Sequence, residues 1–172
     1  MTALPTFSEI CRKPVLFFAL GFGSGLLPKA PGTWGSIFAL GLYCLIFPYL
    51  PLAWAALALL VSFIVGIWFC AAAASALGAH DHGAVVWDEF VGQWMVVYYL
   101  QRVGEFSLLW SLLMGFVLFR LFDIVKPWPI RWFDRKVHGG LGVMLDDVLA
   151  AIMAIGVVFI VEFFGLIGFL VA

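Results

Sequence analysis

Charged side chains are scarce in this sequence, and they are unevenly placed. Lysine, arginine, aspartate and glutamate make up 11% of the 172 residues, whereas 65% of the chain is hydrophobic. Soluble domains carry about 25% charged residues, so this composition excludes an ordinary soluble protein and indicates a chain that crosses a membrane several times. The formal net charge of −1 also argues against nucleic acid as a partner, because the basic surplus for phosphate binding is missing.

The motifs of several enzyme classes are also missing. Cys11, Cys44 and Cys70 stand alone in apolar surroundings without CxxC or metal-ligand spacing, so we interpret them as small buried hydrophobic residues. The sequence has no Cys-x5-Arg loop, no Asp-x-Asp-x-Thr motif and no GxSxG elbow. A covalent enzyme intermediate therefore has no obvious nucleophile. If the protein catalyses a hydrolysis, water activated by a metal ion is the simpler mechanism.

Long uncharged runs set the expected architecture. No Asp, Glu, Lys or Arg occurs from residue 30 to residue 79, a stretch that would measure about 75 Å as one helix. A bilayer core is about 30 Å thick, so the run must fold back, and the hinge is predicted at Pro48-Tyr-Leu-Pro51. Val15 to Leu27 is apolar but only about 20 Å long as a helix, too short to cross. We expect an interfacial or re-entrant helix there.

These segments predict an all-α fold in a single domain over residues 1–172. The fold is a polytopic membrane helical bundle with four to five transmembrane helices and a short N-terminal interfacial or re-entrant helix. Expected spans cover residues 34–50, 52–77, 85–100, 106–125 and 148–172. Thr33 or Ser36 is the expected N-cap of the first span.

Counting crossings predicts which polar segments share a membrane face. If residues 15–27 do not cross, residues 28–36, 80–82 and 126–136 lie on one face, and residues 48–51 and 101–105 lie on the other. The first face carries most of the basic residues, and the second has only Arg102. The positive-inside rule then makes the first face cytoplasmic.

Six carboxylates are expected at that cytoplasmic face, namely Asp81, Asp88, Glu89, Asp123, Asp146 and Asp147. Crowded carboxylates repel one another at a low-dielectric boundary unless a cation lies among them. Oxygen donors without a Cys/His set suit Mg²⁺. Helix capping explains a single acid about as well, but it does not explain all six, because Asp123 falls near a helix C-terminus, where the dipole disfavours it.

Helical spacing predicts which acids point into the bundle. Asp147 shares a stripe with Ala150, Ala151 and Ala154, a small-residue face suited to close helix packing. We therefore expect Asp147 to face inward, with Asp146 beside it. Neighbouring side chains diverge by about 100° on a helix, so Asp88 and Glu89 are not expected to point at the same target. Either of the two could face inward.

Basic and hydroxyl side chains near the acids are candidates for binding a phosphate. Lys29, Thr33 and Ser36 stand at the start of a predicted helix, where free amides and the dipole attract anions, although simple helix packing explains the glycine-rich turn about as well. Arg120 and Lys126 are candidates for clamping phosphoryl oxygens. The remaining basic residues of the 126–136 loop are interpreted as an ordinary positive-inside cluster.

His80 and His82 flank Asp81 in the second polar segment. A zinc site is a weaker interpretation, because the usual ligand spacing is absent. We interpret His82 as a general acid for the leaving alkoxide, or as a hydrogen-bond partner of a carboxylate.

Three sequence blocks carry a family resemblance. They are Gly21-Phe-Gly-Ser-Gly-Leu with Pro31-Gly-Thr-Trp-Gly-Ser36, His80-Asp-His-Gly with Trp87-Asp-Glu-Phe-Val-Gly92, and Phe119-Arg-Leu-Phe-Asp-Ile-Val-Lys-Pro-Trp-Pro through His138-Gly-Gly to Asp146-Asp147. From about residue 20 to residue 151, the chain closely resembles the phosphatidylglycerophosphatase A family.

The resemblance implies a multihelical, Mg²⁺-dependent lipid phosphatase of the bacterial inner membrane. Such an enzyme converts the anionic phospholipid phosphatidylglycerophosphate to phosphatidylglycerol and inorganic phosphate. The family's motif acids fall on all six carboxylates of the predicted cluster. We expect Asp88, Glu89, Asp123 and Asp147 to hold the metal, and Asp81, His82 and Asp146 to be catalytic, with Asp81 or Asp146 orienting the attacking water. The expected substrate-binding residues are Lys29, Thr33, Ser36, Arg120 and Lys126.

Two other functions compete with this hypothesis. A CDP-alcohol phosphotransferase is also a small metal-dependent membrane protein, but its Asp-Gly-x2-Ala-Arg…Gly-x3-Asp-x3-Asp pattern is absent. A cation transporter lined by carboxylates would need acids at mid-membrane depth on several helices, whereas among the acids of the predicted spans only Glu162 stands away from the predicted face. The oligomeric state is left open by the sequence.

Overall fold

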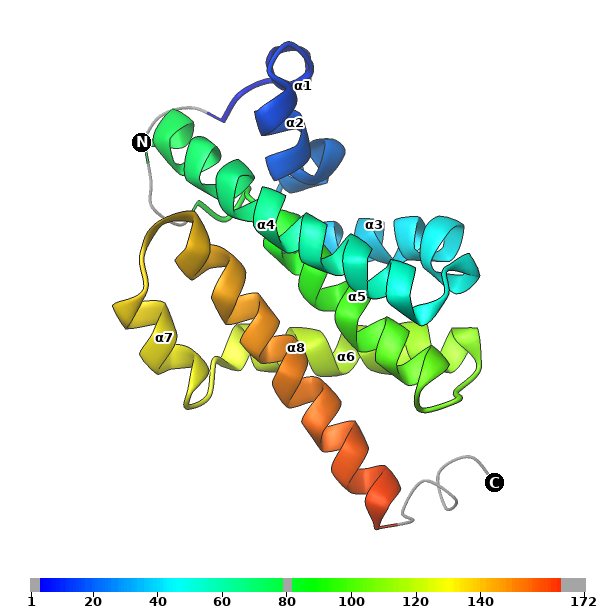
Figure 1. The fold of residues 1–172 in the computed structure, drawn as a ribbon. Coiled ribbons are helices and arrows are strands. Elements are labelled where there is room, and N and C mark those ends of the chain that lie inside the picture. The colour runs from blue at the N-terminus through cyan, green and yellow to red at the C-terminus, as the bar shows by residue number, and fades with distance from the viewer. Residues whose placement is uncertain (1–3, 79–81, 165–172) are drawn as a thin grey trace.

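The computed structural model describes residues 4–78 and 82–164, and its described part consists of helices joined by short loops, without a strand. In chain order the elements are α1 (Phe7–Cys11), α2 (Pro14–Ala19), η1 (Gly21–Leu26), α3 (Pro31–Ile46), η2 (Phe47–Tyr49), α4 (Leu52–Leu77), α5 (Trp87–Arg102), α6 (Leu108–Val125), α7 (Ile130–Lys136) and α8 (Gly139–Phe163). Figure 1 shows the long helices gathered into one bundle. The all-α prediction is confirmed.

Four segments are long and apolar enough to cross a membrane: Pro31–Tyr49, Leu52–Leu77, Leu108–Val125 and Gly139–Phe163. Only 22% of the α4 segment and 17% of the α6 segment are buried within the protein. Large exposed apolar patches are rare on soluble monomers, so the exposed apolar surface of α4 and α6 needs a nonaqueous environment. The chain is thus a helical membrane protein, as the composition predicted.

Helix α5 occupies the middle of the bundle and packs against α3, α4, α6 and α8 (Figure 1). Eleven of its sixteen residues are buried, including Asp88 and Gln93. Because neighbouring helices surround it, α5 carries polar groups into the protein interior without exposing them to lipid.

Residues 15–27 form two short helical pieces, α2 and η1, and lie outside the four segments long enough to cross a membrane, as expected for so short an apolar run. Helix α2 packs against α4, and η1 packs against α3. The Val86 N–H donates to the Ala19 carbonyl at 3.0 Å, which joins this segment to the residue just before α5. The segment therefore supports the end of the bundle at which α5 begins.

The two loops predicted to share the opposite face do lie together. Tyr43 donates its hydroxyl to Gln101 Oε1 at 2.6 Å, and Arg102 donates to the Pro48 carbonyl. The predicted hinge is also present, with η2 ending at Tyr49 and α4 beginning at Leu52. Polar loops far apart in the sequence thus meet at this end of the bundle.

Two predicted helix starts were wrong. Helix α8 begins at Gly139 rather than at residue 148, so Asp146 and Asp147 lie two turns inside it and do not cap it. Helix α3 begins at Pro31 behind a left-handed Ala30 (φ 50°), so neither Thr33 nor Ser36 is its N-cap. Helix α3 starts earlier than expected because proline is tolerated at the first helical position. Helix α8 starts before its apolar run, and Asp146 inside it pairs with Lys126.

Candidate active site

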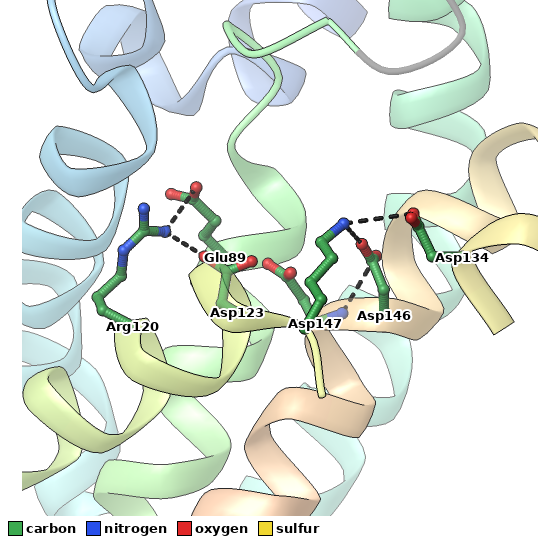
Figure 2. Close-up of polar contacts among 7 residues, drawn as sticks. Glu89, Arg120, Asp123, Asp134, Asp146 and Asp147 are labelled. Carbon is green, nitrogen blue, oxygen red and sulfur yellow. Dashed lines mark hydrogen bonds and ion pairs between the residues drawn. The ribbon is translucent and has the colours of Figure 1, made fainter. Parts of the chain in front are cut away.

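Three helices bring five of the predicted acids to one end of the bundle. Asp88 and Glu89 stand in the first turn of α5, and Asp123 in the last turn of α6. Asp146 and Asp147 lie on the part of α8 that packs against α5 and α6. Figure 2 shows four of these carboxylates side by side, with Asp147 between Asp123 and Asp146. We call these five residues the acidic cluster.

Arg120 joins two members of the acidic cluster. Its Nη1 lies 2.9 Å from Glu89 Oε1 and 2.5 Å from Asp123 Oδ2 (Figure 2). The three side chains are 12–14% exposed, so this ion pair is largely shielded from solvent. Such a pair is costly to break, because removing one partner leaves an uncompensated buried charge. Arg120 thereby ties α6 to α5.

Lys126 joins the other side of the acidic cluster to α7. Its ammonium group pairs with Asp146 and, at 3.3 Å, with Asp134 Oδ1 (Figure 2). Burial lowers the pKa of Lys126, but the hydrogen bond and charge of Asp146 more than offset this effect, so its pKa lies above the ordinary value. Lys126 is therefore a permanent cation beside the cluster.

Asp88 and Asp147 keep carboxylate oxygens that nothing in the described part of the chain satisfies. Asp88 Oδ1 and Asp147 Oδ2 are both buried without a hydrogen-bond partner there. Asp147 also experiences the negative charges of Asp123 and Asp88. Unpaired buried carboxylates are strongly unfavourable, so the arrangement calls for a further cation or for protons.

Helix α3 closes over Glu89 through its glycines. A Cβ atom on Gly32 would lie 1.9 Å from Glu89 Oε1, and one on Gly35 would lie 2.9 Å from Oε2. Ser36, on the same face of α3, donates its hydroxyl to Glu89 Oε2 at 3.4 Å. Gly32 and Gly35 of the glycine-rich turn thus let α3 approach a carboxylate.

The remaining predicted site residues lie around this end of the bundle with fewer contacts. Lys29 is exposed just before α3, and Thr33 is half-buried in the first turn of that helix. His82 precedes α5, and its Nδ1 accepts the Ala84 N–H at 3.2 Å. Asp81 lies outside the described residues.

The unpaired atoms of Asp88 and Asp147 are carboxylate oxygens, the type of ligand that a hard divalent cation such as Mg²⁺ prefers. Within residues 4–78 and 82–164, no group of three or more His, Cys, Asp or Glu side chains is positioned to hold a metal ion. Arg120 and Lys126 instead engage Glu89, Asp123 and Asp146. Metal binding by more than two acids thus requires the two basic side chains to give up contacts.

Comparison with known proteins places the fold and this cluster in a family. The family model described as phosphatidylglycerophosphatase A matches residues 17–162, which include the whole acidic cluster. The chain belongs to the phosphatidylglycerophosphatase A family. No solved structure shows significant similarity to it.

Relatives of the phosphatidylglycerophosphatase A family cover most of the chain. A protein named phosphatidylglycerophosphatase A from Escherichia coli is 40% identical over 167 residues, 94% of each chain. One of the same name from Haemophilus influenzae is 44% identical over 150 residues, 87% of this chain and 90% of the relative. A Bacteroides thetaiotaomicron relative, provisionally named a phosphatidylinositol-3-phosphatase, is 42% identical over 144 residues, 81% of this chain and 87% of its own length.

Sequence reasoning singled out neither Asp134 nor Gln93 as a site residue. Asp134 stands on α7 and contacts Lys126, a pairing across eight residues that no helical spacing signals. Gln93 is fully buried one turn beyond Glu89, and both of its amide atoms lack a hydrogen-bond partner within the described residues. An amide inside an apolar helix was the signal that could have marked it.

Proposed function

We propose that this protein hydrolyses the phosphomonoester of phosphatidylglycerophosphate to phosphatidylglycerol and inorganic phosphate, a step of phospholipid biosynthesis. The observation that carries the proposal is the convergence of five carboxylates from α5, α6 and α8 with Arg120 and Lys126 at one end of a membrane bundle. The names of the relatives from Escherichia coli and Haemophilus influenzae support this choice of substrate.

Asp88, Glu89, Asp123 and Asp147 are the proposed Mg²⁺ ligands. Support comes from the two unpaired carboxylate oxygens of Asp88 and Asp147 and from the purely oxygen donor set. When bound, Mg²⁺ supplies charge neutralisation at the phosphoryl oxygens and activation of water.

The other side chains divide the remaining tasks. Asp146, the member of the acidic cluster that pairs with Lys126, is proposed to orient the attacking water, with Asp81 as the alternative for this role. His82 is proposed to protonate the leaving alkoxide of the glycerol. Water adds to phosphorus, the phosphorus–oxygen bond to the glycerol breaks, and inorganic phosphate and the alcohol result.

Positive charge and hydroxyls at the same end are proposed to hold the substrate. Arg120 and Lys126 lie next to the carboxylates and would turn toward phosphoryl oxygens once the acids are engaged by the metal. Lys29 and Thr33, at the start of α3, are proposed to contact the headgroup from the other side. Ser36 contributes by positioning Glu89 through its hydroxyl.

We place the active site at the cytoplasmic face of the bacterial inner membrane. Support comes from the basic residues near this end and from the separate clustering of the loops at 48–51 and 101–102. Cysteines introduced at Arg131 and at Arg102 in a cysteine-free background should react with an impermeant thiol reagent from opposite sides. Labelling of both from one side would contradict the topology.

Phosphate release from a panel of lipids tests the function itself. The purified protein should release phosphate from phosphatidylglycerophosphate with Mg²⁺ and stop with EDTA. Phosphatidylinositol 3-phosphate belongs in the panel because of the Bacteroides relative's name. Release from neither lipid, with CMP release from a CDP-alcohol lipid instead, would favour a phosphotransferase.

A transporter is the weaker alternative. Glu162, an acid of a candidate span outside the acidic cluster, lies at the opposite end of α8, where Tyr99 donates its hydroxyl to it at 3.4 Å. The described acids therefore do not form a continuous path along the bundle. Cation flux into liposomes without phosphate release would overturn the phosphatase proposal.

A further inference from the structure

A second polar site lies between the N-terminal segment and the end of α4. It is a cavity of about 520 Å³, within the roughly 300–1,000 Å³ range of small-molecule sites. Its walls include Thr6, Glu9, Arg12, Lys13 and, from α4, Leu77. None of these residues belongs to the acidic cluster. We call it the N-terminal cavity; Figure 1 shows α1 and α2 beside the end of α4.

The N-terminal cavity carries an excess of positive charge. Its one acid, Glu9, is engaged by the Thr6 backbone N–H at 2.7 Å and the Thr6 hydroxyl at 2.9 Å. These hydrogen bonds hold the pKa of Glu9 below its ordinary value, so it stays ionised within its capping box. Arg12 and Lys13 are exposed and have no ion pair or side-chain hydrogen bond in the part of the chain that the structure describes. The cavity therefore offers two exposed cations that feel the charge of Glu9 but form no close ion pair among the described residues.

The same cavity has an apolar wall. Leu16 and Leu77 line it and are 6% and 5% exposed, so they form a firm apolar floor beneath the two basic side chains. Leu77 is the last residue of α4, one of the candidate spans, which puts the cavity near a membrane boundary. Phospholipid headgroups and the first carbons of their acyl chains occupy this depth.

We propose that the N-terminal cavity binds the phosphodiester headgroup of an anionic phospholipid, with Arg12 and Lys13 against the phosphate and an acyl chain along Leu16 and Leu77. A free phosphate would meet the same cations but leave the apolar wall unused. The bound lipid would join α1 and α2 to the end of α4. This site is separate from the proposed catalytic site and does not depend on the phosphatase proposal.

Lipid retention in native mass spectrometry tests the site, with EDTA present to stop catalysis. The probes are phosphatidylglycerol, phosphatidylcholine with the same acyl chains, and glycerol 3-phosphate. The double variant Arg12→Gln/Lys13→Gln should bind phosphatidylglycerol about tenfold more weakly than the wild type. The matched control Arg135→Gln/Lys136→Gln removes the same charge from exposed positions of α7 and should change binding less than about twofold.

Each other outcome overturns the proposal. Equal weakening in both double variants would mean that diffuse surface charge attracts the lipid. Equal retention of phosphatidylcholine, or of glycerol 3-phosphate, would mean that the cavity does not combine anion and acyl recognition. Unfolding temperatures identify any folding defect. Should the double variant be less stable, Arg12→Gln and Lys13→Gln alone must each show part of the loss.

Discussion

A Cβ atom on Gly32 would lie 1.9 Å from Glu89 Oε1, so the first turn of α3 rests directly on this carboxylate. Glu89 in turn is held by Arg120 from the far side. The position of the Glu89 side chain therefore depends on α3 lacking a side chain at residue 32.

Gly32→Ala should damage the site through this contact. The added methyl group forces α3 or Glu89 to move, which should cost about 1–3 kcal/mol of stability and most of the activity. Gly41→Ala is the control on the same helix, because a Cβ there meets nothing within 4 Å. Phosphate release and thermal unfolding in detergent measure both effects. Equal behaviour of the two variants would show that the close approach of α3 to Glu89 is unimportant.

Arg120→Gln should destabilise the protein more than any single loss of an exposed cation. It leaves Glu89 and Asp123 buried without their shared partner, at a cost of about 3–5 kcal/mol. Arg120→Lys keeps the charge but not the guanidinium geometry, so an intermediate unfolding temperature is expected. Arg131→Gln, at an exposed position, should have an effect below about 0.5 kcal/mol. An unfolding temperature for Arg120→Gln like that of Arg131→Gln would contradict this account of the ion pair.

Asp146 and Asp134, the two acids that pair with Lys126, should differ sharply in their effect on the rate of phosphate release. The Asp146 side chain is 8% exposed, whereas that of Asp134 is 40% exposed. Asp146→Asn should lower the rate of phosphate release by about a hundredfold or more if Asp146 orients water. Asp134→Asn should leave it within about twofold, since an exposed ion pair contributes little. The reverse order would move the catalytic role to α7.

The direction in which Asp147 points could be predicted from the sequence, because it depends on local periodicity. Ala150, Ala151 and Ala154 are all fully buried on the same stripe, and Asp147 is buried with them. The hinge before Leu52 was equally readable, because an uncharged run too long for one bilayer needs a break near prolines.

The ion pairs and the start of α8 could not be predicted in the same way. Lys126 pairs with Asp146 across twenty residues, which makes acids tolerable inside a helix that the apolar run alone would have begun later. Asp123 stands three residues after Arg120 on α6, so helical spacing allows that contact, whereas the contact of Arg120 with Glu89 depends on how α5 and α6 pack.

Removing the charge of Asp88 or Asp147 should separate stability from function. Both side chains are buried with an unpaired oxygen, so Asp88→Asn and Asp147→Asn relieve charge burial and repulsion. In EDTA, the unfolding temperatures of these variants should equal or exceed that of the wild type, although phosphate release is lost. A clear loss of stability in EDTA would show that these carboxylates are structural partners instead.

A direct measurement of metal binding is the most decisive test of a metal site at the acidic cluster. Mn²⁺, a paramagnetic stand-in for Mg²⁺, can be titrated into the detergent-solubilised protein and followed by electron paramagnetic resonance. The wild type and Glu162→Gln, whose change lies at the opposite end of α8, should bind Mn²⁺ alike. Asp88→Asn and Asp147→Asn should bind it at least about tenfold more weakly. Wild-type affinity in Asp147→Asn would contradict a metal site built on the acidic cluster.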